Sequence, residues 1–205
     1  MSDLGLDVGQ ANELKLAFRR TGWLNNEEVK LLCEGDLLGQ VRQVLLGYAT
    51  IVPLDHVVDC DADPLIPQGW SLKGEGAEHR KGGMVKLERR GEDLYANGKK
   101  IELFLVEGQK GSNNIGGHKL RKKLVSKPVL NANVLDYLLK PENQHLIPES
   151  WKGKYVFFWG DVYRGSGGDP CVRCLCWGGG GWNWGYFWLD FDFSSGRPAA
   201  VSASQ

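Results

Sequence analysis

Three aromatic-rich segments near the C-terminal end constrain the fold most. They are KYVFFWGDVYR (154–164), CVRCLCW (171–177) and WNWGYFWLDFD (182–192), and the segments GSGGDP and GGGG link them. Aromatic and β-branched residues favour strands, while short glycine-rich linkers favour turns between neighbouring strands. We therefore expect three antiparallel strands that form a meander.

The segments before this meander predict one strand and two helices. IELFLVEG (101–108) has the alternation of a strand, and HKLRKKLV (118–125) fits a short basic helix. NANVLDYLLKPENQHLI (131–147) fits a helix that begins at Asn131 and that Pro141 ends or kinks. The predicted class is α+β, with the order strand, helix, helix, meander over residues 99–205.

The first half of the chain predicts a helical segment and a connecting region. Residues 1–50 have apolar residues at three- and four-residue spacings, which favours short helices, one of them beginning at Asn25 or Asn26. Residues 51–98 combine prolines, glycines and charged residues, so we expect irregular backbone and exposed loops around a hairpin. The expected organisation is thus 1–50, 51–98 and 99–205.

Charge and hydropathy exclude several classes of protein. The chain has 25 Lys and Arg and 25 Asp and Glu, so no net charge attracts nucleic acid or an anionic membrane. The apolar runs are too short to span a bilayer, so we expect no membrane insertion. The N-terminal residues do not resemble a secretory signal, which makes the cytoplasm the expected compartment, with association with a virion or a surface as the alternative. Reduced thiols are then expected for the five cysteines.

The last fifty residues have an unusual composition. Residues 155–204 contain no Lys, Glu, Gln or Met, whereas residues 1–154 contain 35 residues of these four types. At that rate about eleven would be expected, and Lys and Glu are normally common. Buried strands exclude long charged side chains, but this segment also contains Gly- and Ser-rich loops, where such residues are usual. Burial therefore explains only part of the absence.

A restricted set of codons is our hypothesis for the rest. Codons with two random bases and a pyrimidine in the third position cannot encode Lys, Glu, Gln, Met or Trp. In CLCWGGGGWNWGYFWLDFDFSSGR, tryptophans recur at positions 177, 182, 184 and 188, with Cys, Gly, Asn and Phe scattered between them. We interpret the tryptophans as unvaried framework and the scattered residues as products of such codons.

This segment resembles a known family. VRCLCWGGGGWNWGYFWLDFDFSSGRPAA (172–200) resembles the variable region of variable proteins from diversity-generating retroelements. The upstream segments VVDCDADPLIPQGW, KPVLNANVLDYLL and HLIPESWKGKYVFFWGDVYR also resemble segments of such proteins. In that family a reverse transcriptase copies a template repeat with errors at adenines, and the protein commonly has a C-type lectin fold. The resemblance covers roughly residues 50–205 and implies a C-type lectin-like domain whose variable region is about 171–197.

The resemblance divides this region into two sets of positions. The implied framework consists of Arg173, Leu175, Trp177, Trp182, Trp184, Tyr186, Trp188, Leu189, Asp190, Asp192, Pro198 and Ala199. The implied variable, ligand-binding positions are Cys174, Cys176, Gly178, Gly179, Gly180, Asn183, Gly185, Phe187, Phe191, Phe193, Ser194, Ser195, Gly196 and Arg197.

The expected function is binding without catalysis. Exposed Phe187, Phe191 and Phe193 would provide contact area for a protein or other macromolecular ligand, and glycines 178–181 would leave a shallow floor. No GxSxG, P-loop or HExxH motif occurs, and no nucleophile motif adjoins the four histidines, so we expect no enzymatic activity and no cofactor. Nucleic acid is not an expected partner.

Two alternatives remain open at this point. In the first, the chain is an intracellular metal-binding or nucleic-acid-associated regulator. The candidate residues are the CxxCxC cluster of Cys171, Cys174 and Cys176 and the basic run of Lys119, Arg121, Lys122 and Lys123. A structural zinc site needs four ligands, however, and no second CxxC follows. In the other alternative, residues 1–50 attach the chain to a larger assembly, such as a virion.

Two further motifs predict no metal site. Asp55, His56, Asp59, Cys60, Asp61 and Asp63 could ligate a metal, but they lack the glycine and terminal glutamate of a calcium loop, so we expect caps and turns there. Lys140, Pro141, Glu142 and Asn143 have the wrong order for the Glu-Pro-Asn-like motif of calcium-dependent lectins. We therefore expect no calcium-dependent sugar binding.

Overall fold

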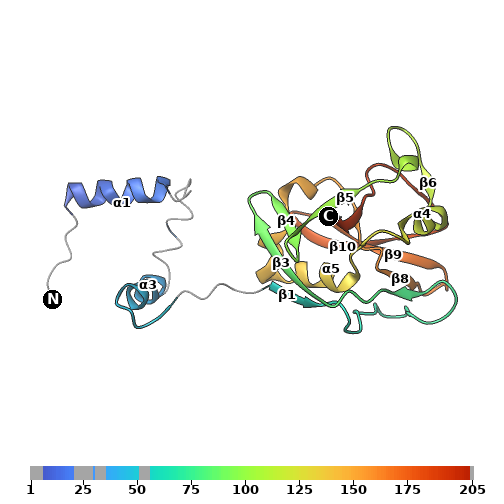
Figure 1. Cartoon of the computed structure of the whole chain (residues 1–205), viewed down its shortest axis with the longest axis horizontal. Helices are drawn as coiled ribbons and strands as arrows, with labels where there is room; N and C mark the ends of the chain where they lie inside the picture. The colour runs from blue at the N-terminus through green and yellow to red at the C-terminus, as the bar shows by residue number, and fades with distance from the viewer. Residues whose placement is uncertain (1–6, 21–29, 31–35, 51–55, 204–205) are drawn as a thin grey trace. The chain divides into compact units, whose positions relative to one another are not determined.

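The computed structural model describes residues 7–20, 30, 36–50 and 56–203, and the chain divides into two compact units, residues 1–54 and 55–205 (Figure 1). In the first unit, α1 (Val8–Arg20) and α3 (Leu37–Leu45) agree with the expected helices. The helix start expected at Asn25 or Asn26 lies outside the described residues. None of the helices in the described part of the chain is long and apolar enough to cross a membrane.

The second unit is mixed α+β, as expected, and contains one large, mostly antiparallel sheet. The strand order is β1-β3-β4-β5-β12-β7-β9-β8-β2, and β10 pairs with β9 off this path. The bounds are β1 (His56–Asp59), β2 (Glu78–His79), β3 (Met84–Arg90), β4 (Asp93–Ala96), β5 (Lys99–Phe104), β7 (Val156–Phe157), β8 (Asp161–Arg164), β9 (Pro170–Gly178), β10 (Gly181–Trp188) and β12 (Ala199–Ser202). A small second sheet pairs β6 (Ile115–Gly116) with β11 (Asp192–Phe193).

The segment 56–98 was expected to form exposed loops around a hairpin, but much of it forms strands of this sheet. The hairpin is present, because β3 pairs with β4, but β1 also pairs with β3 and β4 continues the sheet into β5. Val85 and Leu87 of β3 are buried, with Lys86 exposed between them. This alternation was obscured in the sequence by the flanking charged residues.

Two helices and three 3₁₀ turns complete the unit. The helices α4 (Gly117–Leu124) and α5 (Ala132–Leu138) agree with the prediction, and Pro141 ends the second helical segment by starting the 3₁₀ turn η2 (Pro141–Leu146). The other turns are η1 (Glu107–Gln109) and η3 (Glu149–Trp151).

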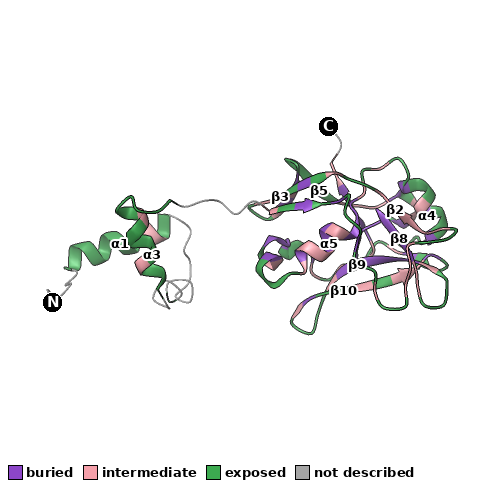
Figure 2. Cartoon of the chain, turned by 90° about the horizontal axis from the view of Figure 1, so that it is seen from below, coloured by how far each residue is buried: buried purple, intermediate pink, exposed green. Residues whose placement is uncertain are grey.

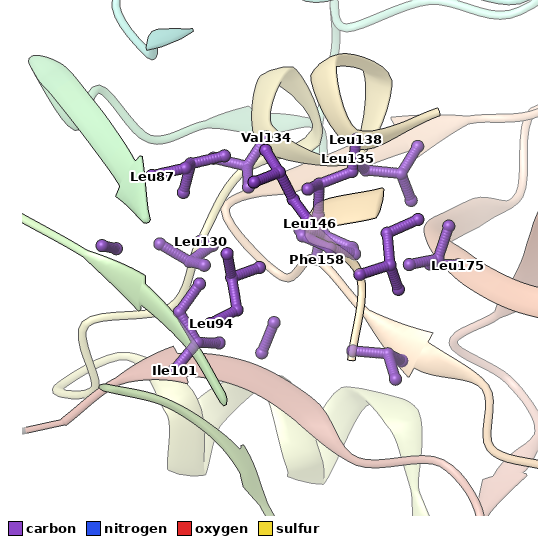
Figure 3. Packing of buried hydrophobic residues seen from close by; sticks show 14 of the residues in the cluster. Leu87, Leu94, Ile101, Leu130, Val134, Leu135, Leu138, Leu146, Phe158 and Leu175 are labelled. Atoms are coloured by element: carbon purple, nitrogen blue, oxygen red, sulfur yellow. The ribbon is translucent and has the colours of Figure 1, made fainter. Parts of the chain in front are cut away.

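Two buried clusters lie on the two faces of the central strands. Val134, Leu135 and Leu138 of α5 pack into the first cluster, which also contains Leu175 of β9 (Figure 3). Leu120 and Leu124 of α4 pack into the second, which also contains Cys174. Because side chains alternate along a strand, the neighbouring residues 174 and 175 point into different clusters.

The segment 154–164, predicted as one strand, is in fact two. Between β7 and β8 the chain turns at residues 158–160, where Gly160 passes close to the N-terminal end of α5. A Cβ at Gly160 would lie 2.7 Å from the Asn131 Cα, so this approach requires glycine. The contact joins residues about thirty positions apart, which local alternation does not reveal.

A buried carboxylate fixes the same junction. Asp161 accepts a hydrogen bond of 2.6 Å from the Ala132 backbone N–H and therefore caps α5, whereas the side chain of Asn131, the residue expected at this cap, donates instead to the carbonyls of Cys60 and Arg80. Asp161 Oδ1 also lies 2.5 Å from His79 Nδ1. Burial raises the pKa of Asp161 more than these hydrogen bonds lower it.

Candidate ligand-binding surface

The β9–β10 hairpin sorts the residues of the two predicted sets onto opposite faces. In its register, Arg173 opposes Tyr186, Leu175 opposes Trp184, and Trp177 opposes Trp182. On the intervening positions, Cys174 opposes Gly185 and Cys176 opposes Asn183. Opposed residues share a face, and successive residues alternate between faces. One face carries the framework positions of both strands together with Cys171, and we call it the framework face. The other carries Cys174, Cys176, Gly178, Asn183, Gly185 and Phe187, together with the unassigned Val172 and Gly181, and we call it the variable face.

The framework face is anchored by an ion pair between a buried arginine and a partly buried aspartate. Arg173, only 1% exposed, donates to both carboxylate oxygens of Asp136 in α5, at 2.9 and 2.6 Å. Burial by itself would lower the pKa of Arg173, but the hydrogen bonds and charge of Asp136 outweigh it and raise that pKa. The guanidinium carbon also lies 4.6 Å from the ring centroid of Trp184. The ion pair thus connects the hairpin to a helix and to the aromatic row beside it.

Aromatic rings continue this face around Trp70, for which the sequence analysis predicted no role. The ring of Trp70 packs edge-on against Tyr186 at 4.9 Å and against Trp184 at 6.1 Å between centroids. Tyr186 in turn packs against Trp188 at 4.8 Å. Such pairs add stability beyond the area they bury, so the packing energy of the hairpin is concentrated here.

Near α4, other side chains cover the variable face. Two positions that were predicted to contact a ligand are buried there, so the prediction is wrong for them. Cys174 is 1% exposed and Phe193 is fully buried, both within the cluster that α4 covers. Burial raises the pKa of the Cys174 thiol to about 12. Phe187 is partly buried, with its ring 5.1 Å from that of Phe193. These residues pack in the core because the face extends under α4 and β11, a coverage that strand alternation alone does not indicate.

The outer end of the same face is open. Asn183 is exposed, Cys176 and Gly185 are partly exposed, and β10 lies at the edge of the sheet, since β9 is its one strand partner among the described residues (Figure 2). A Cβ at Gly185 would meet the Cys174 and Cys176 sulfurs at 3.4 and 3.9 Å, which are ordinary contacts. A side chain other than hydrogen can therefore occupy position 185.

The hairpin turn limits what can replace two of the glycines. Gly179 and Gly180 have φ angles of +62° and +81°, the left-handed region required at both central positions of the commonest two-residue hairpin turn. Asn, Asp and Gly adopt this conformation readily, whereas β-branched residues do not. The Asn183 side chain secures the turn by donating to the carbonyls of Gly178 and Gly181.

The segment 191–197 extends the variable face beyond the hairpin. The Phe191 ring lies 5.5 Å from that of Phe187, and the Arg197 guanidinium carbon lies 3.9 Å above the Phe187 ring. The segment is held in place by the buried Gln109, whose amide donates to the carbonyls of Ser194 and Arg197. The structure thus brings variable positions between Cys176 and Arg197 into one surface.

Each predicted position can be placed by its exposure. Among the variable positions, the exposed residues are Gly178, Gly179, Gly180, Asn183, Phe191, Ser195 and Gly196; the partly buried ones are Cys176, Gly185, Phe187, Ser194 and Arg197. Among the framework positions, the buried residues are Arg173, Leu175, Trp182, Leu189, Pro198 and Ala199, Trp188 is partly buried, and Trp177, Trp184, Tyr186, Asp190 and Asp192 are exposed. The three exposed framework aromatics are nevertheless 38–41% exposed only, because neighbouring side chains cover the rest.

The cysteine cluster does not converge on one point. Cys171 opposes Trp188 on the framework face, whereas Cys174 and Cys176 lie on the variable face. Burial raises the pKa of Cys171, as of Cys174, to about 12, which disfavours the thiolate that a metal requires. Within the described ranges, no three His, Cys, Asp or Glu residues are placed to share a metal ion.

The other charged motifs have local partners. Asp59 accepts hydrogen bonds from the N–H groups of Asp61 and Ala62, and Asp61 accepts one from Gly83, as expected for caps and turns. Asp55 lies outside the described residues. In the basic helix, Arg121 donates to Glu78 Oε2 at 2.6 Å, while Lys119, Lys122 and Lys123 are exposed.

Comparison of this chain with protein-family models, with curated proteins and with solved structures finds no match in any of the three.

Proposed function

We propose that this chain is a non-enzymatic ligand-binding protein whose second unit is a C-type lectin-like scaffold, with a binding surface diversified by a retroelement at adenines. The observation that carries the proposal is the separation of the two sets in space. On β9 and β10, the positions assigned to variation all fall on one face, and those assigned to the framework all fall on the other. A hairpin with one packed face and one face open at its outer end would let residues on the open side be exchanged without loss of the packing, which supports a surface built to vary.

The packing of the hairpin supports the same assignment of fixed and exchangeable positions. The framework face contains the ion pair between the buried Arg173 and Asp136 and the packing around Trp70, so it stabilises the hairpin whatever occupies the other face. On the outer variable face, a Cβ would meet open space at Gly178 and ordinary contacts at Gly185. Binding surfaces of antibodies use the same principle, a fixed scaffold with exchangeable contact residues.

The genetic half of the proposal is tested by sequencing the encoding locus. We expect pyrimidine-ended codons at the variable positions and a nearby repeat of this segment that differs at adenines, beside a reverse transcriptase gene. Purine-ended codons at these positions, with no repeat in the flanking sequence, would overturn the retroelement origin.

The physical half is tested by two matched display libraries. The first randomises Cys176, Asn183 and Gly185; the second randomises their neighbours Leu175, Trp182 and Trp184 on the framework face. We expect folded members throughout the first library and binders after selection on a panel of proteins, but few folded members in the second. Equal loss of folding in both libraries would contradict the proposal.

A further inference from the structure

A small cavity adjoins the variable face beyond the end of β10. It has a volume of about 220 Å³ and is lined by Asp169, Trp188, Asp190 and Phe191. Backbone hydrogen bonds fix its walls: the Leu189 N–H donates to the Pro170 carbonyl at 2.9 Å, and the Phe191 N–H donates to the Trp188 carbonyl at 3.3 Å. The cavity is therefore formed by two chain segments whose relative position is set by the hairpin itself.

Two aromatic rings make the apolar walls. The rings of Trp188 and Phe191 lie 6.0 Å apart between centroids and are inclined at 74° to each other. Trp188 is held by its packing against Tyr186, whereas Phe191 is 54% exposed. The two rings thus form a corner that leaves aromatic surface open to a ligand.

Two carboxylates give the cavity its charge, and no Lys or Arg lines it. Asp190 Oδ1 lies 2.9 Å from His118 Nε2. Across the described part of the chain, the Asp169 carboxylate has neither a hydrogen bond nor an ion pair with another side chain. Acidic groups beside open aromatic faces attract a cation in two ways, by charge and by the ring quadrupole.

The size of the cavity limits what that cation can be. Pockets for drug-sized ligands are typically about 300–1,000 Å³, so this one suits the end of a side chain. An ammonium or guanidinium group has the matching charge and can stack on a ring. Phe191 also belongs to the variable face, so a ligand bound there would reach this cavity.

We propose that the cavity formed by Asp169, Trp188, Asp190 and Phe191 receives a Lys or Arg side chain of the protein ligand. The proposal rests on the proposed function for the protein nature of the ligand. It adds a charge-selective contact in which Trp188 and Asp190 are framework positions, whereas Phe191 is an exchangeable one.

Blocked amino acids test the cavity without a protein ligand. We would titrate N-acetyl-arginine amide and N-acetyl-lysine amide into the full chain, with the uncharged analogues N-acetyl-citrulline amide and N,N′-diacetyl-lysine amide as controls. The readout is the NMR signal of the Trp188 indole N–H, assigned with Trp188→Phe. We expect this signal to shift with the cations only. Equal shifts with the uncharged analogues, or none with any compound, would overturn the proposal.

Variants locate the site. Asp169→Asn should abolish most of the response, and Phe191→Leu, which keeps apolar bulk but removes the ring, should weaken binding roughly two- to fivefold. Asp192→Asn is the matched control, because Asp192 is exposed nearby but does not line the cavity. An equal effect of Asp192→Asn would indicate general charge attraction and contradict the proposal. The display libraries do not involve this cavity, so either proposal can fail alone.

Discussion

Trp184 and Gly185 are consecutive residues of β10, and replacing them should have opposite consequences because they face opposite sides of the hairpin. Trp184 stacks on the Arg173 guanidinium and packs against Trp70 and Tyr186. Gly185 lies on the outer variable face, where an added Cβ makes ordinary contacts only. We expect Trp184→Ala to destabilise the second unit strongly and Gly185→Asn to leave it almost unchanged.

The magnitude follows from the buried area. Trp184 is 41% exposed, so about three fifths of its side chain is buried. With about 200 Å² for a buried tryptophan and about 25 cal/mol per Å², the loss is about 3 kcal/mol. At about 2–4 °C per kcal/mol for a unit of this size, the melting temperature should fall by about 6–12 °C. Gly185→Asn should change the free energy of unfolding by at most about 0.5 kcal/mol.

The assay is thermal unfolding followed by near-ultraviolet circular dichroism, with urea unfolding for the free energies. The double variant measures any coupling between these two neighbouring positions. A Gly185→Asn variant that loses as much stability as Trp184→Ala would refute the assignment of fixed and variable faces.

Three further outcomes follow from the same structure. Gly180→Val should cost about 1–2 kcal/mol in urea unfolding because its φ is +81°, whereas Gly178→Val, at a position with ordinary φ and open space, should cost much less. Iodoacetamide should label Cys176 in the native protein well before Cys174, since Cys174 is 1% exposed with its pKa raised to about 12; tandem mass spectrometry distinguishes them. Burial alone would raise the pKa of Glu78, but hydrogen bonds from two arginines lower it. The stability that the ionised Glu78 contributes is therefore complete above its usual pKa of 4.5 and is lost as the pH falls further. Glu78→Gln should make the free energy of unfolding, measured against pH, fall less steeply below pH 4.5.

The sequence predicts the elements whose signals are local. Strand alternation and the glycine linker were sufficient for β9 and β10, and Pro141 was sufficient for the end of the second helical segment. The alternation also predicts which residues share a face, because the period of a strand is fixed at two. The agreement between the variable set and one face of the hairpin is therefore a property that the sequence already contained.

Coverage of a face depends on contacts between distant segments and could not be predicted. Phe193 was expected to be exposed. Its strand β11 pairs with β6, however, and the Phe193 ring lies among residues from α4 and the central strands. In the same way, Asp161 caps a helix that begins about thirty residues earlier, and Trp70 completes an aromatic row on strands more than a hundred residues away. Nothing in the local pattern around these residues indicates such partners.

Lys, Glu, Gln and Met are absent from both the buried and the exposed positions of residues 155–204. Burial accounts for their absence from β7, β8 and most of β9, since those strands lie in the core. It does not account for the exposed positions of the variable region, among them Gly178, Asn183, Phe191, Ser195 and Gly196, where long polar side chains would meet solvent. Backbone conformation explains glycine at positions 179 and 180 only. At the remaining exposed positions burial and backbone geometry leave the absence of lysine and glutamate unexplained, and the codon restriction in our proposed function would account for it.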